Sequence, residues 1–311
     1  MVTCILFGVQ MNNNRTWNIL NWNIRGINSP DKWLALGQKI EESACAILCL
    51  QETKREHFDA AYIKNFCPNR LNKFAFLPSI GASGGLLITW NGSLFEGEVI
   101  FQNRFSLSIS FTSLLSNQSW VLTNIYGPCV QADKIEFINW FSNIHMPLDT
   151  SWILVGDFNF IRATTDRNRP GGDVNEMQLF NEAISNLGLI KLPLHGRKYS
   201  WSNMQQSPLL EKLDWFFTSA SWMTAFPDTI AMPLSRPISD HLPCVIKIGT
   251  SIPKARVFRF ENYWLKHSDI KEVVSAAWNT PVGNLDAAKS LNAKFKNLRR
   301  ALKLWAKNLS C

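Results

Sequence analysis

Short apolar runs rich in β-branched and aromatic residues recur along most of the chain, and Gly, Pro, Asn and Ser bound them. Runs of this length and composition are typical of β-strands. The pattern predicts strands at Trp17–Asn23, Ala46–Gln51, Gly85–Trp90, Leu107–Phe111, Trp120–Tyr126, Trp152–Asp157, Tyr199–Ser202, Leu213–Thr218 and Pro243–Ile248.

Apolar residues recur at helical spacing in three other segments, Asp31–Glu42, Asp133–Ile144 and Asn175–Leu187. These helices fall between predicted strands, although strands are the more numerous elements. The alternation favours two packed sheets flanked by helices over a parallel, doubly wound sheet. We therefore predict an α+β fold, a four-layer α/β/β/α sandwich built on two mixed β-sheets.

The end of the chain has a different pattern, an apolar stripe along one face of a single helix. Its residues are Leu291, Phe295, Leu298, Leu302 and Trp305. The stripe fits a helix that packs on its own domain or on another one, and it also fits a dedicated DNA-binding helix. The chain is thus predicted to have three parts, an N-terminal extension (1–16), a main domain (17–250) and a basic helical linker or tail (251–311).

The positive charge of the chain is concentrated in that tail. The 311 residues carry a formal charge of +8, and 46% of them are hydrophobic, which is enough for a substantial core. From Pro253 onward there are 12 Lys and Arg against 4 Asp and Glu, so residues 1–252 balance to zero. A basic tail on a neutral body suits a polyanionic partner, although many basic tails are only solvated.

Neither the cysteines nor the start of the chain indicate secretion or a membrane. The seven cysteines include no C-x-x-C pair, and Cys45 and Cys49 lie in an apolar run where thiols serve as small core residues. This usage is typical of a reducing compartment and predicts neither a disulfide framework nor a zinc site. The apolar start of the chain lacks a basic region, and no apolar window reaches transmembrane length.

Four short polar segments follow directly after apolar strands, where a β scaffold can hold a rigid site. They are Trp22–Gly26, Gln51–Thr53, Gly156–Asn159 and Ser239–His241. Each one alone is weak, because a polar strand end is more often a solvated edge or a cap. Together with Asp214, however, they offer several carboxylates, amides and one imidazole in a single chain.

That set of side chains suits the cleavage of a phosphodiester. The reaction needs a metal that neutralises phosphate charge, a base that acts on water, and a group that stabilises the leaving oxygen. Magnesium prefers one or two carboxylates with room left for water and phosphate. The sequence has no Cys/His zinc spacing and no Gly-rich phosphate loop that would point to another chemistry.

Six short motifs follow one another along the chain: Asn23–Gly26, Gln51–Thr53, Tyr126–Pro128, Gly156–Asn159, Leu213–Asp214 and Ser239–Pro243. As an ordered set they resemble the motifs of the endonuclease/exonuclease/phosphatase superfamily, which implies a DNase I-like fold. Three further segments, Gly84–Leu87, Arg169–Gly172 and Tyr199–Asn203, resemble the endonuclease domains of plant LINE-type (non-LTR) retrotransposons. The resemblance covers Asn18 to Ile248, and Arg256–Trp278 resembles the linker that follows such domains.

The resemblance implies a metal site and a base. Glu52 is the expected principal ligand of Mg²⁺, with Mn²⁺ as a substitute, and Asn23 supports it. Asp240 is expected close enough to ligate the metal or orient its water. Asp157 is expected to position or deprotonate the attacking water.

The resemblance also implies groups that hold the phosphate. Asn159 and Tyr126 are expected to hold the scissile phosphate, and His241 is expected to contact it. Asp214 would fix the ring of His241 and keep it protonated. Arg25 and Ser200 are the expected substrate-binding residues, and Ser200 stands where the family often has Thr.

The implied function is a Mg²⁺-dependent DNA endonuclease that nicks one strand, leaving 3′-hydroxyl and 5′-phosphate ends. In a full retroelement this 3′-hydroxyl would prime reverse transcription, but no reverse transcriptase is present in this chain. Asn203–Lys212 is expected to form a hairpin loop that enters the minor groove, where shape governs recognition. Trp215 departs from the polar residue that related elements usually carry there.

Two alternatives remain open, a catalytically inactive nucleic-acid-binding remnant and a phosphatase of the same superfamily. DNA is the expected partner, with no membrane and no protein partner predicted. Because the substrate is DNA, the expected location is the nucleus, and otherwise the cytoplasm.

Overall fold

The computed structural model describes residues 17–81, 83–147, 149–249, 264–265, 267–283 and 287–308. The predicted N-terminal extension (1–16) and the start of the predicted linker (251–263) lie outside these residues. The chain forms two compact units, Met1–Ser251 and Ile252–Cys311.

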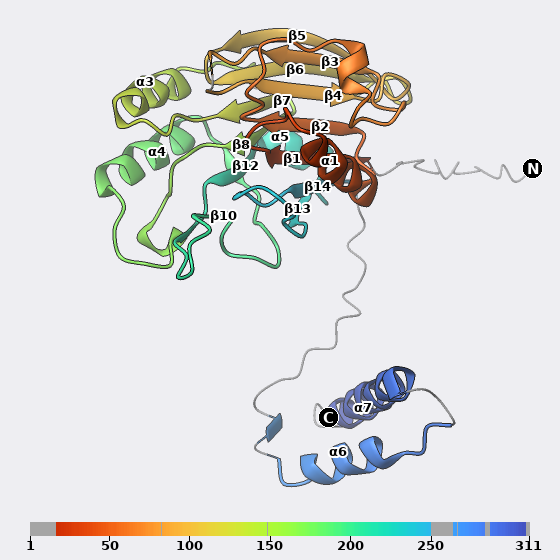
Figure 1. Ribbon diagram of the computed structural model, residues 1–311. Coiled ribbons are helices and arrows are strands. Elements are labelled where there is room, and N and C mark those ends of the chain that lie inside the picture. The colour runs from red at the N-terminus through yellow and green to blue at the C-terminus, as the bar shows by residue number, and fades with distance from the viewer. Residues whose placement is uncertain are drawn as a thin grey trace, which may run out of the picture. The chain divides into compact units, whose positions relative to one another are not determined.

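The first unit contains two six-stranded sheets and a small hairpin (Figure 1). In sheet 1 the strands β1 and β2 run parallel, and every other neighbouring pair is antiparallel. Its order is β13 (Ile230–Pro233), β14 (Cys244–Ile248), β1 (Trp17–Asn23), β2 (Ile47–Gln51), β4 (Leu86–Trp90) and β3 (Lys73–Leu77).

Sheet 2 repeats this mixed arrangement, because β7 and β8 run parallel while their neighbours are antiparallel. The short strands β10 (Trp201–Ser202) and β11 (Leu210–Glu211) pair with each other and form the expected hairpin. The order of sheet 2 is β5 (Phe95–Asn103), β6 (Ser106–Ser113), β7 (Ser119–Tyr126), β8 (Trp152–Asp157), β12 (Asp214–Thr218) and β9 (Ile190–Lys191).

Helices cover the outer faces of both sheets. Helix α1 (Pro30–Ser43) packs on sheet 1, whereas α3 (Gln131–Ser142) and α4 (Val174–Asn186) pack on sheet 2. Short helices α2 (Ala60–Ile63) and α5 (Ala220–Ala225) and a 3-10 turn, η1 (Thr164–Asp166), complete the unit.

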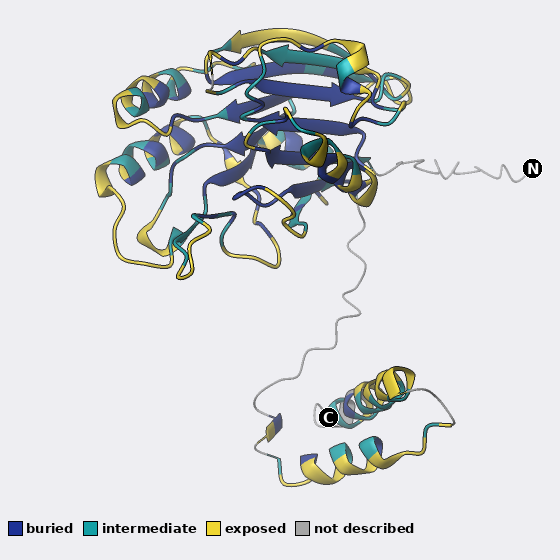
Figure 2. Cartoon of the chain, in the orientation of Figure 1, coloured by how far each residue is buried: buried dark blue, intermediate teal, exposed yellow. Residues whose placement is uncertain are grey.

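Three apolar clusters separate the four layers. One contains Ile153 and Val155 with the facing residues of sheet 1, and it fills the space between the sheets. Leu154 points the other way, into the cluster beneath α3 and α4. Strands buried on both faces read as continuous apolar runs, which is why the sequence pattern identified them. Figure 2 shows these strands as dark blue bands, and the four-layer α/β/β/α prediction is confirmed.

Strand β5 was missed by the sequence analysis. It is an edge strand whose Val99, Ile100 and Phe101 are more than two-fifths exposed, and its pairing shifts register between Val99 and Phe101. The alternation of apolar and polar residues therefore fails there, although the backbone still pairs. The predicted strand Tyr199–Ser202 is shorter in the structure and covers only its last two residues.

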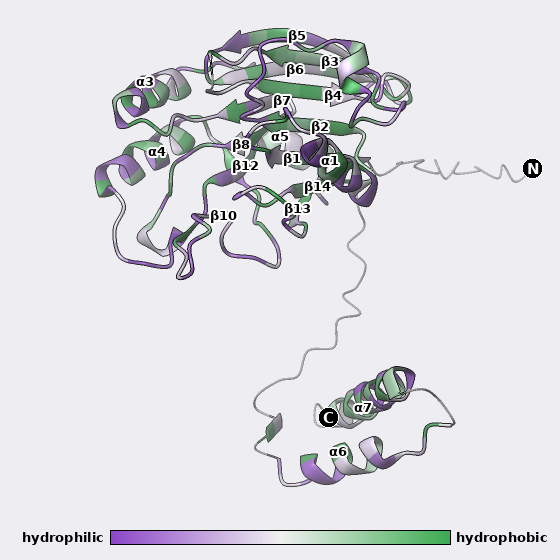
Figure 3. Ribbon diagram, viewed as in Figure 1, coloured by the Kyte–Doolittle hydropathy of each residue, from purple (hydrophilic) through white to green (hydrophobic). Residues whose placement is uncertain are grey.

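The second unit contains α6 (Ile270–Asn279) and α7 (Ala287–Asn308). The stripe of α7 is divided: Leu302 is buried with Trp264 and Ile270, whereas Leu291 and Phe295 are exposed. Figure 3 shows apolar and polar residues side by side along both helices. No helix within the described residues is long and apolar enough to cross a membrane.

Candidate active site

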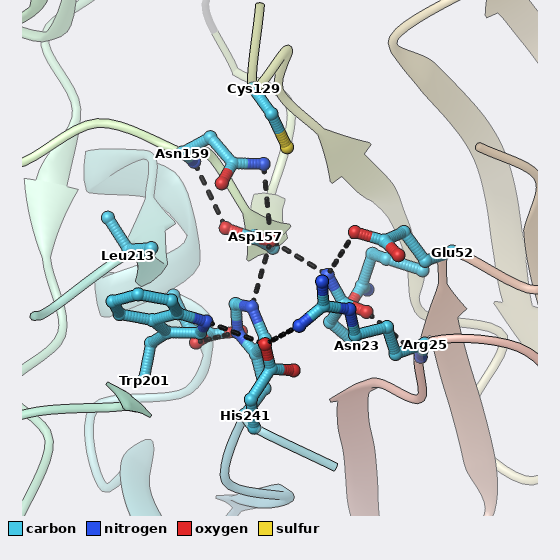
Figure 4. A network of polar contacts seen from close by, with 12 residues as sticks. Asn23, Arg25, Glu52, Cys129, Asp157, Asn159, Trp201, Leu213 and His241 are labelled. Atoms are coloured by element: carbon cyan, nitrogen blue, oxygen red, sulfur yellow. Dashed lines mark hydrogen bonds and ion pairs between the residues drawn. The ribbon is translucent and has the colours of Figure 1, made fainter. Parts of the chain in front are cut away.

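The polar strand ends of both sheets meet at one end of the sandwich. Asn23 ends β1 beside Gln51 of β2, so Glu52 directly follows at the same edge. In sheet 2, Asp157 at the end of β8 lies between Tyr126 of β7 and Asp214 of β12. Because both sheets present strand ends of this kind here, residues far apart in the chain converge (Figure 4).

Asp157 lies at the centre of the site and is fully buried. Its Oδ2 accepts hydrogen bonds from Asn23 Nδ2 at 2.8 Å and Asn159 Nδ2 at 3.2 Å, and its Oδ1 accepts one from the Asn159 amide at 3.0 Å. His241 Nε2 lies 3.4 Å from Oδ2. A buried carboxylate is costly unless it is paired in this way.

Burial raises the pKa of Asp157 to about 7, even though the nearby His241 opposes the shift. A carboxylate whose pKa lies close to neutral pH is a better proton acceptor than an ordinary aspartate. The surroundings of Asp157 therefore suit a group that takes a proton from water.

His241 is held on its other side by a second buried carboxylate. Its Nδ1 lies 2.9 Å from Oδ2 of Asp214, and both residues are buried. Burial lowers the pKa of His241, but the charges of Asp214 and Asp157 outweigh that effect and raise it to about 9. The imidazole is therefore protonated at neutral pH and can donate a hydrogen bond to an anion.

Asn159 and Tyr126 border the same centre. Asn159 Nδ2 also donates to the Gly127 carbonyl at 2.8 Å, which fixes its amide over Asp157. The Tyr126 hydroxyl donates to Glu52 Oε1 at 2.7 Å. Burial, followed by the Glu52 charge, raises the pKa of Tyr126, so this hydroxyl stays protonated and remains a donor.

Glu52 lies at the rim of the site, with its side chain 12% exposed. Its Oε2 is 3.5 Å from Lys54 Nζ, and its Oε1 is 3.4 Å from Asn23 Nδ2. The described residues include no group of three or more His, Cys, Asp or Glu placed to hold a metal. One accessible carboxylate beside an amide nevertheless fits Mg²⁺, which keeps several waters and takes few protein ligands.

Asn23 departs from the expected arrangement in one respect. Its oxygen accepts from the Arg25 amide at 3.1 Å, and its nitrogen is the atom that faces Asp157 and Glu52. To ligate a metal beside Glu52, the amide has to rotate so that its oxygen faces the carboxylate.

Asp240, which is also predicted near the metal, accepts from three donors, one of them the Ser239 hydroxyl, 3.4 Å from its Oδ1. Arg25 Nη1 forms an ion pair with its Oδ2, and Trp201 Nε1 donates to the same oxygen at 2.9 Å. The sequence analysis gave Trp201 no role, because an indole at a strand end carries no signal of a polar partner. Arg25 is 56% exposed at its side chain, so its remaining guanidinium nitrogens face solvent.

Ser200, one of the two expected substrate-binding residues, is fully buried. Its hydroxyl accepts hydrogen bonds from the backbone amides of Leu213 at 3.1 Å and Asp214 at 3.0 Å. Both bonds fix the start of β12. Ser200 therefore positions Asp214, and its expected contact with the substrate stays a prediction.

Backbone strain is also concentrated at this end of the sheets. Arg25, Glu52, Lys54 and Asn159 all have φ between 49° and 56°, the left-handed region that costs non-glycine residues of order 1 kcal/mol or more. Each follows a strand end, where the chain turns sharply and points its side chain into the site. Sequence patterns carry no signal for this feature.

Two glycines of the motifs are required by close backbone approach. A Cβ at Gly127 would lie 1.9 Å from the Phe158 carbonyl oxygen, and one at Gly156 would lie 2.0 Å from that of Ile125. These glycines let β7 and β8 approach closely and so bring Tyr126 beside Asp157.

Comparisons with known proteins agree with this geometry. The model of the endonuclease/exonuclease/phosphatase family matches residues 20–241. A Xenopus laevis protein, the transposon TX1 uncharacterized 149 kDa protein, is 24% identical over 174 residues, which span 52% of this chain and 13% of that protein.

The fold is also found in solved structures. An AP endonuclease from Archaeoglobus fulgidus superposes with a TM-score of 0.59 at 15% identity, covering 75% of this chain and 100% of that one. The endonuclease domain of TRAS1, a telomere-specific non-LTR retrotransposon, gives 0.56 at 13% identity, covering 76% and 99%. At such identities the likeness concerns the fold.

Proposed function

Because this chain belongs to the endonuclease/exonuclease/phosphatase family, we propose that it is a Mg²⁺-dependent DNA endonuclease. It nicks one strand and leaves 3′-hydroxyl and 5′-phosphate ends, as in the target-site nicking of a LINE-type retrotransposon. The observation that carries the proposal is the buried contact of Asp157 and Asp214 with opposite nitrogens of His241, next to the accessible carboxylate of Glu52.

Glu52, with Asn23 after rotation of its amide, would hold Mg²⁺, or Mn²⁺ in its place. When bound, the cation supplies positive charge that polarises the phosphate and stabilises the charge of the reaction. Asp240 is already bonded to Arg25 and Trp201, so it orients the arginine at the rim.

The remaining residues act on water and phosphate. Asp157 accepts a proton from the attacking water, because its raised pKa matches that task. Protonated His241 and the amide of Asn159 donate to the phosphate oxygens, where negative charge must be stabilised. Asp214 keeps the ring of His241 oriented and charged, and Tyr126 keeps the Glu52 carboxylate in place.

A DNA substrate is favoured over a small phosphomonoester because the cations around Glu52 and Asp240 are already bonded within the protein, whereas the cations beside the site that form no ion pair within the described residues, Arg197, Lys198 and Arg236, are exposed. A compact, highly charged phosphate needs several converging cations. Arg25 and Lys54 are already paired with Asp240 and Glu52, and Arg55 stacks 3.4 Å from the Tyr62 ring. Two similar solved structures, which are named as an AP endonuclease and as the endonuclease domain of a retrotransposon, support a nucleic-acid substrate. We also propose that the protein acts in the nucleus, where this substrate lies.

The experiment that tests the proposal is nicking of supercoiled plasmid by the full chain. Wild type is compared with Asp157→Ala and with Asp149→Ala, a matched change at an exposed aspartate away from the site. We expect Mg²⁺-dependent conversion to open circles that chelator and Asp157→Ala abolish and Asp149→Ala does not. Extension of the nick by a DNA polymerase then verifies the 3′-hydroxyl.

Two outcomes would contradict the proposal. If folded wild type binds plasmid without nicking it in Mg²⁺ or Mn²⁺, the chain is an inactive nucleic-acid-binding remnant. If it releases phosphate from an inositol polyphosphate and leaves plasmid intact, it is a phosphatase of the same family.

A further inference from the structure

A cavity of about 300 Å³ lies beside the candidate active site and has no role in the proposed reaction. Three basic side chains line it, Arg197, Lys198 and Arg236, together with Tyr199 and Trp201. We propose that this basic cavity binds a backbone phosphate of the DNA strand, next to the phosphate that is cleaved. The inference rests on the proposed function, because it names how that substrate is held.

The basic cavity shares a wall with the site. Trp201 lines the cavity, and its indole nitrogen also bonds the carboxylate of Asp240 at 2.9 Å. The backbone of Trp201 pairs with that of His241, and the Leu242 amide donates to the Ser200 carbonyl at 2.8 Å. A strand whose phosphate contacts His241 can therefore reach the mouth of this cavity with a neighbouring phosphate.

The charge of the basic cavity is not neutralised by the protein. No carboxylate lines it, and none of its three cations forms an ion pair within the described residues. Arg236 donates to the Asp240 backbone carbonyl at 3.3 Å, and Lys198 Nζ lies 5.3 Å from the Tyr199 ring. Both contacts orient a positive charge and leave it available to an anion.

Exposure of the three cations favours a phosphodiester in a polymer over a small buried ligand. Arg197, Lys198 and Arg236 are all exposed, so they can reach a strand that lies across the surface. A second basic group differs in this respect: Arg162 and Lys212 are part-buried over the Trp215 ring, at 5.5 and 4.5 Å, and burial lowers their pKa. That second group packs on the protein, whereas the basic cavity faces outward.

The first test measures DNA binding by the full chain without Mg²⁺ over a range of salt concentrations. The cavity variant Arg197→Ala/Lys198→Ala is compared with Lys73→Ala/Lys247→Ala, which removes the same charge at the other end of sheet 1. We expect the cavity variant to bind DNA about tenfold more weakly than wild type. The logarithm of the association constant falls with the logarithm of the salt concentration, and we expect this fall to be less steep by about one unit of slope for the variant. The control should keep the wild-type slope.

A second measurement locates the contact on the DNA. Single phosphates of a short duplex are replaced in turn by neutral methylphosphonates, and each duplex is bound to wild type and to the cavity variant. We expect one or two positions beside the nick at which the replacement weakens wild type about tenfold and the cavity variant hardly at all. Arg236→Ala should lose its sensitivity at the same position.

The results separate this inference from the proposed function. If wild type nicks plasmid but no position distinguishes the cavity variant from wild type, the phosphate contact is wrong and the endonuclease stands. Another outcome is that inorganic phosphate binds to wild type and not to the cavity variant, and yet displaces no DNA from wild type. In that case the cavity is a site for a free anion, which also overturns the inference. If wild type does not nick, the binding measurements still decide whether the cavity holds DNA.

Discussion

The candidate site has two halves that differ in burial. The buried half consists of Asp157, Asp214, His241 and Asn23, none of which is more than 4% exposed. The rim half consists of Glu52, Arg25, Lys54 and Asp240, whose side chains are 7% to 56% exposed. The lengths of the ionic contacts do not separate the halves, because the longest is 3.4 Å in the buried half, His241 to Asp157, and 3.5 Å in the rim half, Glu52 to Lys54. Exposure to solvent is what separates them.

The difference shows how one fold supplies two kinds of chemistry. Burial shifts the pKa of Asp157 and brings the charges of Asp214 and Asp157 to bear on His241, so the proton chemistry depends on a dry, fixed environment. The proposed metal and its waters would have to enter and leave, so a ligand such as Glu52 would have to face solvent. We therefore expect substitutions in the buried half to be severe and those at the rim to be mild or recoverable.

The largest effect is expected for Asp157→Asn. The amide keeps the shape of the side chain but cannot accept a proton from water. We expect single-turnover nicking to fall by at least about 10³-fold, within the range of general base catalysis. Quenched-flow or manual sampling of plasmid nicking measures the rate, and Asp149→Asn at the surface serves as the control. A rate within tenfold of wild type would assign the base to another residue.

The next effect concerns the partner of His241. Asp214→Asn leaves the ring in place but removes the charge that raises its pKa, and Asp214 Oδ1 has no hydrogen-bond partner to lose among the described residues. We expect a loss of about 10²-fold at neutral pH. Because His241 is charged only below its pKa, the loss should grow as pH rises from about 6 to about 8.5.

A double variant sharpens that expectation. If Asp214 acts through His241, then Asp214→Asn combined with His241→Gln should cost little more than His241→Gln alone. Additive losses would mean that Asp214 has a separate role, such as holding the start of β12. Thermal unfolding of each variant shows whether the fold itself was lost.

At the rim, Glu52→Gln should change the metal requirement more than the maximal rate. The amide keeps a weak oxygen ligand, so we expect the magnesium needed for half-maximal nicking to rise about 10- to 100-fold. At saturating magnesium, the rate should return to within about tenfold of wild type. If the nicking rate of Glu52→Gln stays low at every magnesium concentration, then Glu52 does more than bind the metal, and its role resembles that of the buried residues.

Much of this arrangement was predictable because buried strands leave a strong sequence pattern. The apolar runs before Glu52 and Asp157, and the run before Asn23 that two asparagines interrupt, identified the strands, and the polar residues after them identified the end of the sandwich where the site lies. Helix α1 extends one residue beyond each end of the predicted range Asp31–Glu42. In the structure, Ser29 caps it by accepting a hydrogen bond from the Lys32 amide, and Pro30 follows in the first turn.

The remaining features depend on contacts that no local pattern encodes. Trp201 and Asp240 are 39 residues apart, and Arg25 and Asp240 are 215 apart, so only the folded chain shows that they meet. The positioning role of Ser200 was missed for the same reason, since its motif gives the hydroxyl but not the buried amides it bonds. Apolar residues on the exposed edge strand β5 likewise broke the alternation on which the prediction depended.

The smallest effect is expected for Lys54→Met, which keeps the aliphatic stem and removes the charge. Its ion pair with Glu52 is 3.5 Å long and its side chain is 35% exposed, and pairs of this kind contribute about 0–1 kcal/mol. We therefore expect nicking to change by less than about fivefold, similar to Lys64→Met at an exposed position in α2's C-cap. A loss comparable to that of Asp214→Asn would show that Lys54 contacts the substrate, and substitutions at the rim would then no longer be milder than those in the buried half.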